Sequence, residues 1–465
     1  MSFPSPLDVL RQAVLGRAAL LTATAWVTVQ HGVQQALRLG TNVVLARLLA
    51  PELLGTMLLI NTLRTGGELL SDVGIGQSIV SHERGRDPMF FNTAWTIQII
   101  RGALLFAIAL LITRPLAELY DSPQLTVLLP VAALVFLISG FTSPSKFLLQ
   151  KDMQVRRLAL LGIAMAVSSS AIHIALAMYT PTIWALIFGL LLSTAGGTLA
   201  SFFLLDWKMH AIRFDRKSAR AIVGFGKWVF LSSLIYFAAM NFDRLYLAGA
   251  VPFALLGIYG IARTFADAIT QLFLRISRMI IFPKVAAARD QISDLRRRVL
   301  PARRVVLCAI ALGIAALVAV ADEFIYLAYD PRYKAAGIYL PVLLVGAWFA
   351  ILASIAEAML LGIGKSSSMA FSNGAKFVIV VITVPLLLPT AGMLAATGAL
   401  VLGEAARYAV LVWRKRAHGI SFIRQDVAAT ALLLVAILAF RELTHLIGIT
   451  GGIFAWVAEA RDQLA

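Results

Sequence analysis

Charged side chains recur at helical spacing inside segments that are otherwise apolar. Arg263, Asp267, Gln271 and Arg275 follow one another at intervals of four residues, which places them on one face of a helix. A charge costs roughly 3 kcal/mol at the centre of a bilayer, so such residues face a bundle interior or a water-filled cavity. Arginine outnumbers acid in these segments, and its planar guanidinium binds phosphate oxygens in pairs. The pattern predicts a binding site for an anion within the membrane.

The stretch "NFDRLYLAG", 241–249, adds two adjacent charges, Asp243 and Arg244. Adjacent residues do not share a helical face, so each of the two is expected to find a partner on another helix as well. Two further polar stripes run through 30–38 and 61–72 at intervals of three or four residues.

Together these stripes and some isolated charges give the candidate site. The residues predicted to bind the anion are Arg38, Arg64, Arg244, Arg263 and Arg275. The acids predicted to act as gates or ion-coupling groups are Glu68, Asp72, Asp243, Asp267, Glu357 and Glu404. A plainer alternative applies to each of them, namely that intrahelical pairs such as Arg64 with Glu68 only lock the bundle.

The elements that carry these residues are long apolar segments. Of the 465 residues, 60% are hydrophobic and 14% are charged, which is more apolar surface than a soluble core can bury. Segments long enough to span a bilayer lie at 18–40, 50–75, 91–113, 124–145, 157–179, 182–205, 221–249, 254–283, 304–325, 337–362, 367–388, 391–413 and 427–447. The predicted fold is an all-α integral membrane protein with about 12 to 14 transmembrane helices.

The net charge of +17 collects in the loops. Basic residues fall in alternate loops, with the longest run at 296–298 and a later run at 414–416, while the intervening loops are short and neutral or acidic. By the positive-inside rule, the amino terminus is cytoplasmic. The acidic cluster at 321–323 is predicted to be a solvated helix end. A nucleic-acid partner is not expected, because the chain has almost no polar surface to accompany its basic residues.

An internal repeat is visible when the chain is shifted by about 200 residues. "LARLLAPELLGTM" at 45–57 then lies on "LAGAVPFALLGIY" at 247–259, so that Gly55 matches Gly257. Because an even number of spans separates the copies, they share their orientation in the membrane. We therefore predict an amino-terminal six-helix half at 1–210, a carboxy-terminal six-helix half at 211–425, and an extra membrane segment at 426–465. The cavity is expected between the halves.

The sequence predicts no catalytic residue, no metal site and no cofactor. "GIGKSS" at 362–367 lacks the first glycine of a phosphate-binding loop, and the histidines show no metal-ligand spacing. The single cysteine, Cys308, lies in an apolar run and excludes a disulfide within the chain.

Several stretches resemble polysaccharide-export flippases, the Wzx-type branch of the multidrug, oligosaccharidyl-lipid and polysaccharide exporter superfamily. They are "NVVLARLLAPELLGTMLLINTLRTGGELLSDVGIGQSIV" at 42–80, "LLQKDMQVRRLAL" at 148–160, "FGKWVFLSSLIYFAAMNFDRLYLAG" at 225–249 and "YDPRYKAAGIYLPVLL" at 329–344. The family's motif includes an Asp-x-Gly near the end of the second helix, matched by Asp72, and an Asn-x-Asp in the seventh, matched by Asp243.

The resemblance implies a non-enzymatic flippase in the bacterial inner membrane. Its substrate would be an undecaprenyl-diphosphate-linked oligosaccharide for exopolysaccharide, capsule or O-antigen, and its partners would be membrane lipid, a polysaccharide polymerase and export machinery. We expect two halves that rock about a central cationic cavity. The alternatives are a flippase of the peptidoglycan precursor lipid II, a cation-coupled multidrug exporter of the same superfamily, and a membrane-embedded polymerase or ligase. The last class needs a large outer loop, which the sequence lacks.

Overall fold

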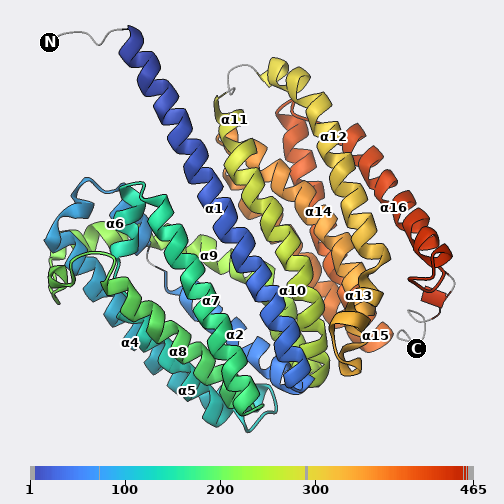
Figure 1. Cartoon of the computed structure of the whole chain (residues 1–465), viewed down its shortest axis with the longest axis horizontal. Coiled ribbons are helices and arrows are strands. Elements are labelled where there is room, and N and C mark those ends of the chain that lie inside the picture. The colour runs from blue at the N-terminus through green and yellow to red at the C-terminus, as the bar shows by residue number, and fades with distance from the viewer. Residues whose placement is uncertain (1–5, 73, 288–291, 454, 457, 459–465) are drawn as a thin grey trace. The chain divides into compact units, whose positions relative to one another are not determined.

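The regular elements of the described chain are all helical (Figure 1). The computed structural model describes residues 6–72, 74–287, 292–453, 455–456 and 458, and within them no strand occurs. Contacts divide the chain into two compact units. Unit 1 comprises Met1–Leu48 and Gly67–Leu231, and unit 2 comprises Leu49–Gly66 and Ser232–Ala465. The predicted halves at 1–210 and 211–425 stay a prediction about the repeat, since these units are defined by contacts.

Among the described residues, unit 1 contains five whole helices of more than ten residues and a long part of a sixth. The elements are α1 (Pro6–Leu48), α3 (Ile75–Ser81), η1 (Glu83–Arg86), α4 (Pro88–Leu119), α5 (Leu125–Gly140), α6 (Ser145–Lys151), α7 (Val155–Tyr179), α8 (Ile183–Phe202) and η2 (Trp207–Met209). Two helices, α2 (Pro51–Leu70) and α9 (Arg216–Ala250), are divided between the units.

Unit 2 holds the remaining elements. They are α10 (Phe253–Ile276), the π-helix η3 (Ser277–Ile281), α11 (Phe282–Ala287), α12 (Ile292–Ala319), α13 (Ala321–Ala328), η4 (Pro331–Tyr333), α14 (Ala336–Gly362), α15 (Ser367–Ala417) and α16 (Ile423–Leu446).

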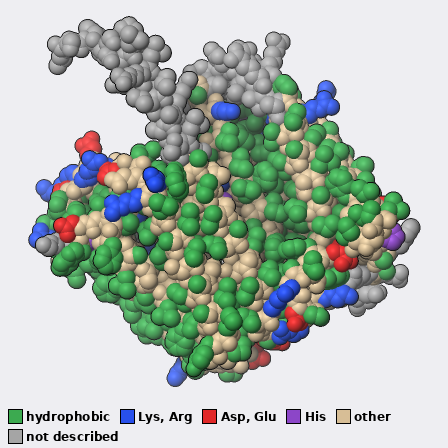
Figure 2. All heavy atoms as spheres, viewed as in Figure 1, with side chains coloured by type: hydrophobic (Ala, Val, Ile, Leu, Met, Phe, Trp, Pro, Cys, Tyr) green, Lys and Arg blue, Asp and Glu red, His purple; other side chains and the backbone are tan. Residues whose placement is uncertain are grey.

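Seven helices of the described residues are long and apolar enough to cross a membrane, or up to nine if each of two bent pairs forms one span. The predicted segments 18–40, 50–75 and 221–249 lie on further helices, α1, α2 and α9. The predicted span 304–325 is not straight, because the chain bends by 53° between α12 and α13, where Val320 leaves helical geometry. Figure 2 shows hydrophobic side chains over most of the visible surface, as a multi-pass membrane protein requires.

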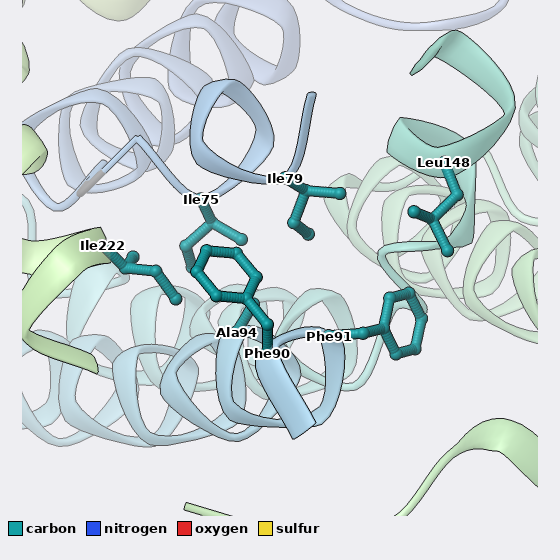
Figure 3. Packing of buried hydrophobic residues seen from close by; sticks show 7 residues of the cluster. All are labelled: Ile75, Ile79, Phe90, Phe91, Ala94, Leu148 and Ile222. Atoms are coloured by element: carbon teal, nitrogen blue, oxygen red, sulfur yellow. The ribbon is translucent and has the colours of Figure 1, made fainter. Parts of the chain in front are cut away.

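Unit 1 packs through small residues and one apolar cluster. A Cβ atom on Gly102 of α4 would lie 2.5 Å from the Phe136 oxygen of α5, so the two helices approach closely only because this residue is glycine. At one end of the unit, buried side chains from α3, α4, α6 and α9 gather around Phe90 and Phe91 (Figure 3). This cluster holds the short helix α3 against the first turns of α4.

Unit 2 is built around α14, the most deeply buried of the seven spans. This helix contacts α10, α12, α13 and α15. The first turns of α2 and α10 meet at two glycines, where a Cβ on Gly55 would lie 1.9 Å from the Phe253 oxygen and one on Gly257 would lie 2.0 Å from the Pro51 oxygen. The two glycines matched by the sequence repeat therefore lie at one helix crossing.

The longest helix, α15, contains two predicted spans. Its first arm (367–390) and second arm (393–417) are separated by Ala391 and Gly392, which have non-helical backbone angles. Gly392 has a φ of 68°, a left-handed conformation that glycine adopts without strain. The chain can therefore turn back here, and residues from the two arms meet.

Candidate functional site

Charged side chains from α9 and α10 form a first group, which we name the aspartate cluster. It consists of Asp243, Arg244, Tyr259, Arg263 and Asp267. Tyr259, Arg263 and Asp267 lie four residues apart on α10, so one face of that helix presents all three. Arg244 Nη2 lies 2.5 Å from Asp267 Oδ2, and Arg263 Nε lies 3.2 Å from Asp267 Oδ1. Tyr259 donates its hydroxyl proton to Asp243 Oδ2, which is also 3.8 Å from Arg263 Nε.

The partners of the two adjacent charges are on the neighbouring helix, as their spacing predicts. Asp243 binds Tyr259 and faces Arg263, whereas Arg244 pairs with Asp267. Each charge of "NFDRLYLAG" is thus compensated by α10.

A second group, the glutamate cluster, joins α14 to both arms of α15. It consists of Glu357, Lys376, Glu404 and Arg407. Lys376 Nζ lies 2.6 Å from Glu404 Oε1, and Arg407 Nη1 lies 3.2 Å from Glu404 Oε2. Arg407 Nη2 reaches Glu357 Oε1 at 2.8 Å. The side chains of Arg407 and Glu357 are 7% and 5% exposed, so this pair is buried.

Members of both clusters line one small pocket in unit 2. Arg263 and Asp267 lie on its wall together with Glu357, Glu404 and Arg407. Its volume of about 70 Å³ is enough for roughly two water molecules. The pocket wall carries three acids and three bases, because Arg278 also lines it, so the pocket is electrically balanced rather than strongly cationic.

The pairs differ in how readily they can exchange partners. The side chains of Arg244 and Asp267 are 21% and 28% exposed, against 7% and 5% for Arg407 and Glu357. Breaking a buried ion pair leaves an uncompensated charge, whereas a partly exposed arginine can take a new anionic partner at lower cost. Of these two arginines, Arg244 is therefore the one that can change its partner at the lower cost, although it does not itself line the pocket.

One arginine on the pocket wall has no acid partner among the residues that the structure describes. Arg278 is exposed and lies in the π-helix η3 at the end of α10. A π-helix turn inside an α-helix occurs frequently at functional sites. Arg278 thus adds to the pocket wall a positive charge that no acid of the described residues neutralises.

Six of the eleven predicted residues come together in the clusters, and five do not. Arg64 is half-buried in the part of α2 that belongs to unit 2, and Arg275 is half-buried at the end of α10. Arg38 and Glu68 lie in unit 1. The roles predicted for these residues stay predictions, as does a cavity between the two halves.

Asp72 is not part of the helical stripe in which it was predicted. The helix α2 ends at Leu70, and the Asp72 carboxylate instead accepts the backbone N–H of Gly74 at 2.9 Å. Gly74, with a φ of 69°, is the residue directly before α3. The turn after α2 therefore uses the aspartate as a local hydrogen-bond acceptor.

Three members of the clusters were not among the predicted site residues. Tyr259 continues the stripe of Arg263 and Asp267 one step towards the amino terminus, so its spacing was a usable signal. Lys376 and Arg407 stand out in the sequence as charges in apolar segments, but no spacing rule links Lys376 to Glu404 across the turn of α15.

The acidic cluster at 321–323 is not the solvated helix end that the sequence suggests. Asp322 is only 3% exposed, and its Oδ2 lies 2.7 Å from Arg441 Nη2 on α16. The prediction was wrong because a partner 119 residues away compensates the buried charge.

Comparison with known proteins identifies the family. The family described as polysaccharide biosynthesis protein matches residues 44–338, which is more than half of the chain. The chain belongs to the polysaccharide biosynthesis protein family. The resemblance that its sequence motifs predict is thereby confirmed.

Curated relatives of this family member are distant. The teichuronic acid biosynthesis protein TuaB of Bacillus subtilis (strain 168) is 22% identical over 306 residues, covering 64% of this chain and 62% of TuaB. The lipopolysaccharide biosynthesis protein WzxC of Escherichia coli (strain K12) is 21% identical over 281 residues, covering 60% of this chain and 57% of WzxC. The match thus spans less than two thirds of the length of either relative.

Solved structures confirm the predicted fold. The lipid II flippase MurJ, in an inward closed conformation, has a TM-score of 0.75 at 11% identity, covering 93% of this chain and 94% of MurJ. An inward-facing multidrug resistance transporter of the MATE family, from the MOP superfamily, has a TM-score of 0.66 at 17% identity, covering 86% and 95% of the chains. This polysaccharide biosynthesis protein therefore has the fold of the MOP exporters.

Proposed function

We propose that this protein is a flippase for undecaprenyl-diphosphate-linked oligosaccharide repeat units. It would carry them across the bacterial inner membrane, with its amino terminus in the cytoplasm, for exopolysaccharide, capsule or O-antigen biosynthesis. The family match and the MOP exporter fold support a transporter in polysaccharide biosynthesis. The observation on which we base an anionic substrate is the partly exposed Arg244–Asp267 pair, whose Asp267 lines the same pocket as Arg278.

The proposed mechanism exchanges the partner of an arginine. In the empty protein, Asp267 holds Arg244 and Arg263 in place. Arg278 meets the incoming diphosphate first, and a phosphate oxygen then replaces Asp267 as the partner of Arg244 through charge-assisted hydrogen bonds. Because the substrate interacts differently with the two arrangements, its binding shifts the balance between them, as alternating access requires. The polyprenyl tail remains in lipid, and the released carboxylate is free to take up a coupling ion.

Two other transport functions share this fold. A lipid II flippase would use the same phosphate chemistry, whereas an exporter of lipophilic cations would need an acidic and aromatic site. The wall of the pocket in unit 2 carries three bases, Arg263, Arg278 and Arg407, and three acids, Asp267, Glu357 and Glu404. This wall has no excess of acids, which argues against the acidic site that a cationic substrate would need.

The direct test is transport by purified protein in liposomes. We expect a fluorescent polyprenyl-diphosphate oligosaccharide to move between leaflets without ATP, and neither lipid II nor a lipophilic cation to be carried at a comparable rate. Formation of a glycosidic bond would contradict the proposal, and so would faster movement of lipid II or of the cation.

The residue assignment has its own test in cells. Arg244→Glu and Arg263→Glu should each abolish polymer production, because the reversed charge repels the diphosphate. Arg220→Glu, on an exposed position of the same helix α9, should leave it normal. Membrane insertion of all three variants is checked by immunoblotting of the membrane fraction. Normal polymer output from both cluster variants would remove these arginines from the site.

A further inference from the structure

An apolar groove lies beside the arms of α15, away from the pocket. It has a volume of about 800 Å³ and is lined by apolar residues, among them Ile235 of α9, Phe371 of the first arm and Val410 of the second arm. None of its lining residues lines the pocket, which touches the first arm through Met369 and Asn373 instead. The groove is therefore a separate feature of unit 2.

The floor of the groove is open. A Cβ atom on Gly374 would meet no other atom within 4 Å, and Phe371 and Val378 on the same arm are 58% and 52% exposed. In a bilayer, such an apolar surface is in contact with hydrocarbon chains. The groove thus offers a hydrocarbon chain an open apolar surface along the first arm.

One end of the groove carries a positive charge. Ala406, Val410 and Arg414 follow one another at intervals of four residues, so the groove-lining face of the second arm leads to Arg414. The Arg414 guanidinium lies 4.5 Å from the ring centroid of Phe371, which is itself a groove residue. A cation on an aromatic ring therefore closes an otherwise apolar groove.

Arg414 has no acid to neutralise it among the residues that the structure describes. Its Nε atom is buried without a hydrogen-bond partner. The adjacent Lys415 turns the other way, where it is buried 3.8 Å from Asp426 Oδ2. Arg414 is thus the cation of this helix end that lies against a groove residue, and no acid of the described residues neutralises it.

We propose that this groove binds an anionic phospholipid, with an acyl chain along the first arm and its phosphodiester on Arg414. One unpaired guanidinium matches the single negative charge of a phosphodiester such as that of phosphatidylglycerol, whereas a diphosphate calls for more than one cation. Basic pockets between transmembrane helices on the cytoplasmic side are known to hold anionic headgroups. The basic turn at 414–416 lies on that side by the positive-inside rule. This site does not depend on the proposed transport function.

The test is lipid binding to delipidated full-length protein in detergent, followed by native mass spectrometry with phosphatidylglycerol or phosphatidylcholine. We expect tighter binding of phosphatidylglycerol, a preference that Arg414→Gln weakens roughly tenfold and that Arg414→Lys largely retains. Gly374→Leu should reduce binding of both lipids, because its side chain fills the open floor. Arg416→Gln removes an exposed charge from the same turn and should have no effect.

Several results would overturn the proposal. Equal affinity for the two lipids would show that Arg414 does not read the phosphate charge. An equal loss in Arg414→Gln and Arg416→Gln would indicate diffuse attraction to a basic surface. Displacement of phosphatidylglycerol by an equimolar polyprenyl diphosphate would assign the groove to the transport substrate. Gel filtration and thermal unfolding without added lipid, unchanged in each variant, show that lost binding is not lost folding.

Discussion

At the scale of single residues, unit 2 contains two kinds of ion pair, which differ in burial and in the role that we infer for them. The Arg407–Glu357 pair is buried and links α15 to α14, whereas the Arg244–Asp267 pair is partly exposed. A buried pair contributes little when intact but is costly to break, because the remaining charge has no compensation. We infer that the glutamate cluster mainly fixes the bundle and that the aspartate cluster offers the exchangeable arginine.

The stabilities of variants at Arg407 and Arg244 should distinguish these two roles. Arg407→Met should lower the free energy of unfolding by about 3–5 kcal/mol, since it leaves Glu357 unpaired in the interior. Arg244→Gln should cost less, because water reaches that pair. Thermal unfolding in detergent measures both, and Glu357→Gln added to Arg407→Met should restore part of the loss. Equal stability of Arg407→Met and the wild type would show that the buried pair is not formed.

The sequence predicts those contacts that one helix can encode. The four-residue spacing of Arg263 and Asp267 indicates their pair directly, and the adjacency of Asp243 and Arg244 indicates partners on another helix. The contact between Lys376 and Glu404 depends on how the two arms of α15 meet, which no local spacing specifies. Arg441 and Asp322 are further apart still, and for this reason the acid looked solvated.

At the scale of elements, helix positions were largely predictable, whereas their ends and bends were not. Long apolar runs indicate a helix at each expected span, because hydrocarbon requires the backbone to satisfy its own hydrogen bonds. The early end of α2 before Asp72 and the bend at Val320 depend on local turns, which carry little hydropathy signal.

The crossing of α2 and α10 should tolerate no side chain at its two glycines. Gly55→Ala and Gly257→Ala each place a methyl group about 2 Å from a backbone oxygen, so we expect each to lower stability by roughly 1–3 kcal/mol. Gly313→Ala is the matched control, since this exposed glycine of α12 has nothing within 4 Å of the added atom. It should be neutral or stabilising by about 0.5–1 kcal/mol. Similar melting temperatures for all three variants would contradict the close crossing.

The hydrogen bonds at the start of α9 should make the free energy of unfolding depend on pH. Asp215 accepts hydrogen bonds from the Ser218 hydroxyl at 2.7 Å and the Ser218 N–H at 2.9 Å, and these bonds, with Arg84 nearby, lower the pKa of the Asp215 carboxyl. A lowered pKa stabilises the folded state above the unfolded pKa, and this contribution is lost as pH falls through the folded pKa.

Removing the Ser218 hydroxyl tests this contribution of Asp215 to stability. Ser218→Ala should lower the melting temperature at neutral pH, and the difference from the wild type should shrink in acid as Asp215 becomes protonated. Differential scanning fluorimetry over a pH series measures both effects. A difference that stays constant with pH would mean that Asp215 is not involved.

At the scale of the whole molecule, the chain passes between its two units three times, and two of these passages lie inside helices. One falls between Gly66 and Gly67 of α2, and the other falls between Leu231 and Ser232 of α9. Paired glycines are sites where helices bend. A Cβ on Gly66 would meet Phe237 of unit 2, and one on Gly67 would meet Phe136 of unit 1. Each of the two glycines therefore packs against an aromatic ring of its own unit.

Stiffening α2 at its two adjacent glycines should lower the transport rate but have little effect on the stability of the protein. Gly67→Ala removes one flexible residue, and the ring of Phe136 can move to admit the methyl group. We expect a lower flipping rate in liposomes at an unchanged melting temperature, whereas Gly313→Ala, in the middle of α12, should leave the rate unaltered. A wild-type rate for Gly67→Ala would argue against bending of α2 during the transport cycle.

The pairing of charges between α9 and α10 also bears on how the protein is made. These helices are consecutive, and the aspartate cluster contains two acids and two arginines, so the cluster is neutral once both helices are present. α10 with its continuation is also the least apolar of the seven spans, and an isolated helix of this kind enters a bilayer poorly. During synthesis, we therefore expect α9 to stay at the translocation channel until α10 has been made, and the two helices to enter the bilayer as a pair. The salt bridges of the aspartate cluster would then also be required for membrane insertion.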